Sequence, residues 1–226
     1  MAIIEGGVSA ALAGIGSQSA SGLHSIAKPQ DYSSLGHYKF AGVTGAIGAG
    51  MAANGEIFQL RWSDATRFAV ITKVKVTGLR ATTAFAAGAI DLKATIARSW
   101  SANGSGGTAL TLTDPQLQLR TSMGATLVGD ARIATTAALG AGTKTLDTQD
   151  VGFIAAHSSG GDGSATPIVG SIKVPNNGEL FVADIASGEH PIVLAQNEGI
   201  VIRATVPATG VWNASLEITW AEVAAF

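Results

Sequence analysis

The sequence contains no cysteine, so disulfide bonds and cysteine-ligated zinc sites are excluded. Charge is also scarce, because Lys, Arg, Asp and Glu make up 13% of the 226 residues, about half the usual share. The net charge is −2 and no basic run occurs, so the signature of a nucleic-acid-binding protein is missing. Mean hydropathy is +0.32, yet no run of about 18 apolar residues predicts a membrane-spanning helix. We therefore expect neither nucleic acid nor a membrane as a partner.

Small neutral residues take the place of the missing charges. The chain has 29 glycines and is rich in Ala, Ser and Thr. Because the cores of protein interfaces are depleted in charge, a surface of this kind suits contact with other subunits. We expect a homo-oligomer that assembles with other proteins, and the alternative is a soluble monomer with a neutral surface.

Short strand patterns run through residues 37–226, separated by Gly, Asn-Gly or Pro at intervals of about 8–14 residues. At the C-terminal end, two such patterns face each other across a short turn. In the second of these, Leu216, Ile218 and Trp220, followed by Val223, alternate with polar or small residues, which is typical of a strand with one buried face. The predicted strands cover residues 38–43, 56–62, 68–76, 89–100, 117–120, 131–134, 144–146, 151–156, 168–174, 179–185, 192–194, 198–206 and 215–223.

This spacing predicts an all-β fold, an antiparallel β-sandwich or jelly roll, for residues 37–226. Segments 168–174 and 179–185 flank Asn176-Asn177-Gly178 and suggest a hairpin. Arg98 falls on the apolar side of the segment 89–100, so we expect the alternation to shift there or the strand to leave the core.

Residues 1–36 differ from the rest and predict an extended N-terminal arm. Glycines at positions 6, 7, 14, 16 and 22 limit any helix to a short one around 8–12. Fully extended, the arm could span on the order of 100 Å, enough to reach a neighbouring subunit. We expect its larger apolar side chains to bind partners: Ile3, Ile4, Val8, Leu12, Ile15, Leu23, Ile26 and Tyr32.

No motif in the sequence predicts catalysis, a cofactor or a metal site. The four histidines (24, 37, 157 and 190) match no metal-binding spacing, and the carboxylates are spread singly. The glycine-rich segment 45–50 is followed by a turn and a strand, unlike a dinucleotide-binding loop. Trp62 and Trp220 alternate with core residues, so we expect them in the core. Trp100 and Trp212 lie at strand ends beside loops and form a possible ligand surface.

Three segments carry a family resemblance: EIFQLRWSDATRFAVITKVKV, RTSMGATLVGDARIATTAALGAGTKTLD and HPIVLAQNEGIVIRATVPATGVWNASLEITWAEV. Together they resemble small virion structural proteins of tailed bacteriophages, over roughly residues 38–226. The resemblance implies a virion component without enzymatic activity. The favoured role is a capsid decoration or cement protein on the capsid surface. Such a protein would be a homo-oligomer, with a trimer favoured, and would contact the major capsid protein or other virion proteins.

The alternative is a host-surface or glycan-binding module of a fibre or tail. Trp100, Trp212 and the loop 157–167 would then carry ligand binding.

Overall fold

The computed structural model describes residues 4–6, 11–13, 36–160, 171–172, 174–184 and 188–226. The chain divides into two units, Met1–Asp31 and Tyr32–Phe226. In the first unit, β1 (Ile4–Gly6) pairs antiparallel with β2 (Ala11–Ala13). The possible helix around 8–12 is therefore wrong for Ala11 and Leu12, since β-pairing takes precedence in a segment flanked by glycines that disfavour a helix.

The described part of the second unit contains two sheets. The first is built around the long strand β5 (Phe68–Thr83), which pairs on one side with β14 (Val211–Val223). Strand β14 in turn pairs with β3 (Gly36–Val43) at the edge. On the other side of β5, three short strands follow one another along its length: β10 (Ser171–Ile172), β11 (Glu179–Val182) and β12 (Ile192–Leu194).

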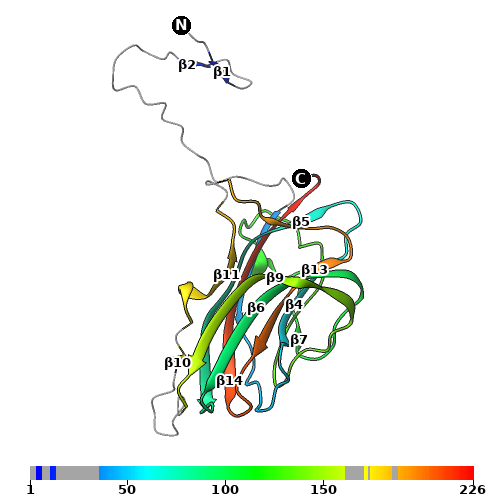
Figure 1. Cartoon of the computed structure of the whole chain (residues 1–226). Coiled ribbons are helices and arrows are strands. Elements are labelled where there is room, and N and C mark those ends of the chain that lie inside the picture. The colour runs from blue at the N-terminus through cyan, green and yellow to red at the C-terminus, as the bar shows by residue number, and fades with distance from the viewer. Residues whose placement is uncertain (1–3, 7–10, 14–35, 161–170, 173, 185–187) are drawn as a thin grey trace, which may run out of the picture. The chain divides into compact units, whose positions relative to one another are not determined.

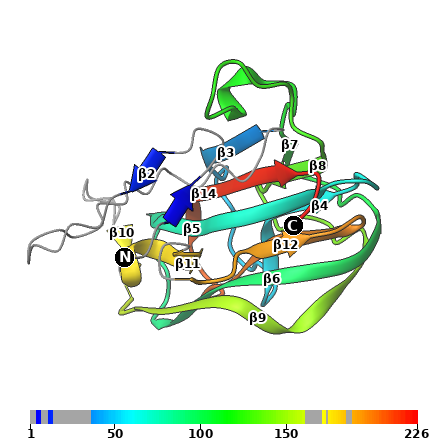
Figure 2. The same cartoon turned by 90° about the horizontal axis from the view of Figure 1, so that it is seen from above.

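A second antiparallel sheet packs against the first. Its strand order is β7 (Thr108–Ala109), β8 (Val128–Ile133), β4 (Gly55–Trp62), β13 (Glu198–Thr205), β6 (Gly88–Ala102) and β9 (Thr143–Ser158). Two short 3₁₀ turns, η1 (Pro115–Leu117) and η2 (Asn176–Gly178), complete the described elements. Figures 1 and 2 show the layer with β5 and β14 facing the layer with β6 and β9. The all-β sandwich prediction is confirmed.

The core lies between the two sheets and contains large aromatic residues from both. Tyr38 stacks on Trp220 with ring centroids 5.6 Å apart, and Phe58 stacks on Phe40 at 5.5 Å. Trp62 and Trp220 expose at most 1% of their surface, as the alternation predicted. Because aromatic rings bury large apolar areas, this cluster is a major source of the sandwich's stability.

The strand pairing shows one difference from the sequence prediction and one feature that the sequence did not specify. The predicted hairpin 168–174/179–185 is wrong, because β10 and β11 both pair antiparallel with β5, at successive positions along it. In addition, the two C-terminal strands lie in different sheets: β13 pairs with β4 and β6, whereas β14 pairs with β3 and β5. They thus face each other across the core, and residues 206–210 carry the chain from one sheet to the other.

An irregular register changes which face of β5 packs on the core. Ile71 and Val74 both belong to the main core, although they are three residues apart. The pairing with β14 skips Thr72, as expected for a β-bulge, so the side chains change face there. Val70 consequently packs with Ala221 and Val223 in a small cluster separate from the main core.

Three predicted short segments also differ in the structure. Residues 144–146 and 151–156 belong to one 16-residue strand, β9, which also includes His157 and Ser158 of the predicted loop 157–167. Residues 161–170 lie outside the described part of the chain. The strand predicted at 117–120 is wrong, because Asp114 caps the 3₁₀ turn Pro115–Leu117 by accepting a hydrogen bond from the Gln116 backbone N–H.

Candidate functional site: a polar hollow beside Arg98

The two tryptophans predicted to form a ligand surface are buried. Trp100 and Trp212 each expose 0% of their surface. Trp212 lies in the main core beside Phe85, with ring centroids 6.3 Å apart, and Trp100 packs with Val201 on the opposite face of the second sheet. A ring that stacks on a ligand needs an exposed face, so the prediction is wrong for both residues. Because the two residues lie at strand ends, the sequence predicts them at the surface, but other segments of the chain cover both rings.

Of the arm residues predicted to bind partners, Ile4 lies in β1 and Leu12 in β2. Ile3, Val8, Ile15, Leu23, Ile26 and Tyr32 lie outside the described residues. Their role in binding stays a prediction.

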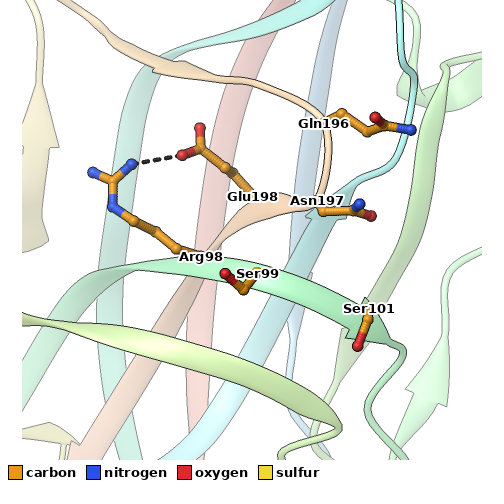
Figure 3. A pocket seen from close by; sticks show the side chains of 6 residues that line it. All are labelled: Arg98, Ser99, Ser101, Gln196, Asn197 and Glu198. Atoms are coloured by element: carbon orange, nitrogen blue, oxygen red, sulfur yellow. Dashed lines mark hydrogen bonds and ion pairs between the residues drawn. The ribbon is translucent and has the colours of Figure 1, made fainter.

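The structure contains an open hollow of about 550 Å³ that the sequence did not predict. Strand β6 contributes three of its lining residues, and the turn before β13 with the first residue of β13 contributes the others. Figure 3 shows the side chains that line it: Arg98, Ser99, Ser101, Gln196, Asn197 and Glu198. All six are polar or charged, so the hollow is suited to hydrogen bonding.

An ion-pair network holds one side of the hollow. The Arg98 guanidinium donates to both carboxylate oxygens of Asp147, at 2.8 and 3.1 Å, and to Glu198 Oε1 at 2.5 Å. The hydrogen bond to Asp147 is the main reason that the pKa of Arg98 is raised. Glu198 Oε2 also accepts a hydrogen bond from the Ala195 backbone N–H at 2.8 Å. Bidentate Arg–carboxylate pairing fixes the orientation of the guanidinium.

Arg61 holds Asn197, on the other segment that lines the hollow, in place by hydrogen bonding. Its guanidinium donates to the Trp100 carbonyl oxygen at 2.7 Å, to Asn103 Oδ1 at 2.7 Å and to Asn197 Oδ1 at 3.0 Å. The Asn197 carboxamide is thereby held by its oxygen, and the side-chain nitrogen is oriented by the same contact.

The backbone of the hollow is unusual at two positions. Ser99 has a φ of 51° and Asn197 a φ of 60°, the left-handed region that non-glycine residues rarely adopt. The two segments are joined by a hydrogen bond from the Trp100 N–H to the Asn197 carbonyl, at 2.7 Å. The left-handed conformation of Ser99 shifts the alternation within β6, so that Trp100 is buried while Arg98 and Ser99 are exposed. The shift expected near Arg98 is therefore confirmed.

A buried polar cluster lies next to Trp100. Lys144 Nζ donates to Glu56 Oε2 at 2.8 Å and lies 4.4 Å from the centroid of the Trp100 ring. Gln59 Nε2 donates to the same Glu56 oxygen, at 2.5 Å. Burial lowers the pKa of Lys144, although the Glu56 carboxylate acts in the opposite direction. The Lys144 side chain is 2% exposed, so the cluster is structural and closed to a ligand from outside.

A second network occupies the same sheet between β6, β9 and β13. Arg203 donates to Asp150 Oδ1 at 2.6 Å and to Thr95 Oγ1 at 2.8 Å, and Thr95 in turn donates to Asp150. Burial favours the protonated form of Asp150, but these hydrogen bonds and the charges of Arg203 and Lys93 outweigh it and lower its pKa. Asp147 and Asp150 thus act as ion-pair partners within β9.

The described residues hold no cluster of three or more His, Asp or Glu side chains that could bind a metal. In the same part of the chain, no helix is long and apolar enough to cross a membrane. Three of the histidines are described: His37 lies in β3, His157 in β9, and His190 packs edge-on against Phe226. No family model, no curated protein and no solved structure matches the chain.

Two signals in the sequence pointed toward the hollow without identifying it. Arg98 interrupts an apolar face, and Gln196-Asn197 forms a polar turn directly before a buried strand. Their proximity depends on the β6–β13 pairing, in which Gly199 lies opposite Ala97. Sequence alone did not provide that register.

Proposed function

We propose that this protein is a structural component of a tailed-bacteriophage virion, acting as a capsid decoration or cement protein. It binds the shell through non-covalent contacts of residues 1–36 and of the sandwich body. Its partners are the major capsid protein or other virion proteins, and it acts as a homo-oligomer, with a trimer favoured. The three segments that resemble phage virion proteins motivate the proposal.

The observation that carries the proposal is a sandwich with a mostly uncharged surface. Only 30 of the 226 residues are charged, from 14 Lys and Arg and 16 Asp and Glu, and many of those described pair with one another. Large apolar side chains are exposed as well: Val43 and Phe226 at 58%, and Leu119 and Phe153 at 52%. Such a surface supports close contact with other subunits, since interface cores are poor in charge.

The expected mechanism is many weak contacts acting together. A specific contact buries on the order of 1,000 Å² for each bound copy. An oligomer that engages several shell subunits gains avidity without any one contact being strong. Closed rotational symmetry is the default for homo-oligomers, and it would place identical arms around a symmetry axis.

The second candidate, a host-surface or glycan-binding module, can no longer rest on Trp100 and Trp212, since both are buried. The observation that favours it is the polar hollow beside Arg98.

Co-purification tests the proposal. Particles are recovered from cells that carry the gene, banded on a density gradient and probed with an antibody against the sandwich body. We expect the chain to band with intact particles, in a fixed ratio to the most abundant shell protein. A chain that stays entirely in the soluble fraction while particles band elsewhere contradicts a virion role.

A further inference from the structure

We propose that the hollow beside Arg98 is a binding site for a neutral saccharide. The inference rests on the hollow alone and holds whether or not the chain is part of a virion. No aromatic side chain lines it, so it offers no ring on which an aromatic ligand could stack. A volume of about 550 Å³ falls within the range of small-molecule sites.

Several polar groups in the hollow are available to a ligand. Within the described part of the chain, Ser99, Ser101 and Gln196 form no side-chain hydrogen bond with the protein, and all three are exposed. The two hydroxyls and the carboxamide can each donate and accept. Sugar hydroxyls also donate and accept, so the two sets of groups complement each other.

The charges in the hollow disfavour an ionic ligand. Arg98, the one cation that lines it, is already shared between Asp147 and Glu198. An anion would have to displace one of these carboxylates and then lie beside it. A cation would compete with Arg98 for the same oxygens and be repelled by the guanidinium. A neutral ligand avoids both costs, and the carboxylate oxygens remain able to accept hydrogen bonds from its hydroxyl groups.

The site is preorganised, which lowers the entropic cost of binding. Arg61 fixes the Asn197 carboxamide, and Asp147 fixes the Arg98 guanidinium. Ser99 and Asn197 keep left-handed backbone conformations on the two segments that line the hollow. Backbone conformations of this kind are concentrated at ligand-binding positions in proteins, where the surrounding structure maintains them.

Nuclear magnetic resonance of the ¹⁵N-labelled full chain tests the site. The probes are methyl glucoside, methyl galactoside, methyl mannoside and N-acetylglucosamine at millimolar concentration, with acetate and sulfate as anionic comparisons. We expect saturable shifts of the Gln196 and Asn197 side-chain amide signals and of the backbone amides of residues 98–101 with at least one sugar. The two anions should leave these signals unchanged.

The double variant Ser101→Ala/Gln196→Ala removes two unpaired groups without touching the ion pairs, and we expect it to weaken binding at least tenfold. The matched control is Thr148→Ala/Gln149→Ala, which removes exposed polar side chains from β9 and should bind like the wild type. Equal melting temperatures would show that both variants are folded. The proposal is overturned if no sugar in the panel gives a saturable shift, if the double variant binds normally, or if only the anions bind.

Discussion

Gly152 on β9 lies against the carbonyl oxygen of Leu180 on β11, so closely that no β-carbon would fit at position 152. The two strands belong to different sheets, and their edges meet at this point. Leu180 is 5% exposed and belongs to the main core. The glycine thus allows the two sheets to close over the core on this side.

Gly152→Ala is expected to destabilise the sandwich by about 2 kcal/mol, because the new methyl group forces the two edges apart and overpacks the seam. Urea denaturation followed by tryptophan fluorescence measures the loss. Gly78→Ala is the matched control within β5, since an added β-carbon there meets only Ser215 Oγ at 4.0 Å. That variant should be neutral or slightly stabilising. Equal stability of both variants would show that the seam is not tightly packed.

The pKa of the buried Glu222 carboxyl is shifted in the opposite direction to the pKa of Glu217. It is 1% exposed, and burial raises its pKa above the ordinary 4.5, although hydrogen bonds from Thr126, Leu127 and Trp220 oppose the shift. The folded state therefore holds this proton more tightly than the unfolded state. Its contribution to stability is fully present below pH 4.5 and is lost as the pH rises through the folded pKa.

The wild type should lose stability between pH 4.5 and the folded pKa of Glu222, whereas the variant Glu222→Gln should not. Above that pH window the variant should therefore be more stable than the wild type. Glu217→Gln is the control of opposite sign. Burial works against ionisation of Glu217, but Lys73 and Lys39 outweigh it and lower its pKa. Its contribution is present above the ordinary pKa and disappears on acidification. Denaturation curves across pH 3 to 9 measure both, and identical profiles for the two variants would refute the assignment.

The buried pair of Lys144 and Glu56 gives a third prediction. Lys144→Met leaves the Glu56 carboxylate buried without its cation, which should cost about 3 kcal/mol. Adding Glu56→Gln removes the stranded charge and should recover most of that loss. Chemical denaturation of the two single variants and the double variant measures the coupling.

Lys75→Met is the comparison for the Lys144 and Glu56 variants. The Lys75–Glu179 pair is more exposed, since its two side chains expose 18% and 41% of their surface. Loss of this pair should cost less than about 1 kcal/mol. If the double variant at Lys144 and Glu56 shows only the sum of the single losses, the two groups do not act as a pair.

Local alternation in the sequence predicted much of the fold, because one face of most strands packs on a single core. Segments 38–43 and 56–62 are strands, and Trp62 and Trp220 are in the core as expected. The jelly-roll form of the sandwich stays a prediction.

Features that depend on long-range pairing could not be predicted in this way. The bulge at Thr72 changes which face of β5 is buried, and it arises from pairing with β14, almost 150 residues later in the chain. Trp100 lies at a strand end, and only the tertiary structure places Lys144 over its ring. The hollow likewise needs β6 and the turn at Gln196 to meet, which the sequence does not specify.

Rebinding to depleted particles tests the virion role most directly. Particles are prepared from cells in which the gene has been deleted, mixed with purified full chain or with residues 37–226, and re-isolated on a gradient. We predict that the full chain rebinds at a saturable ratio to the shell protein. The truncated body should remain folded, shown by an unchanged β-type circular dichroism spectrum, but stay unbound. Failure of the full chain to bind contradicts the virion role, and equal binding of the truncated body contradicts attachment through residues 1–36.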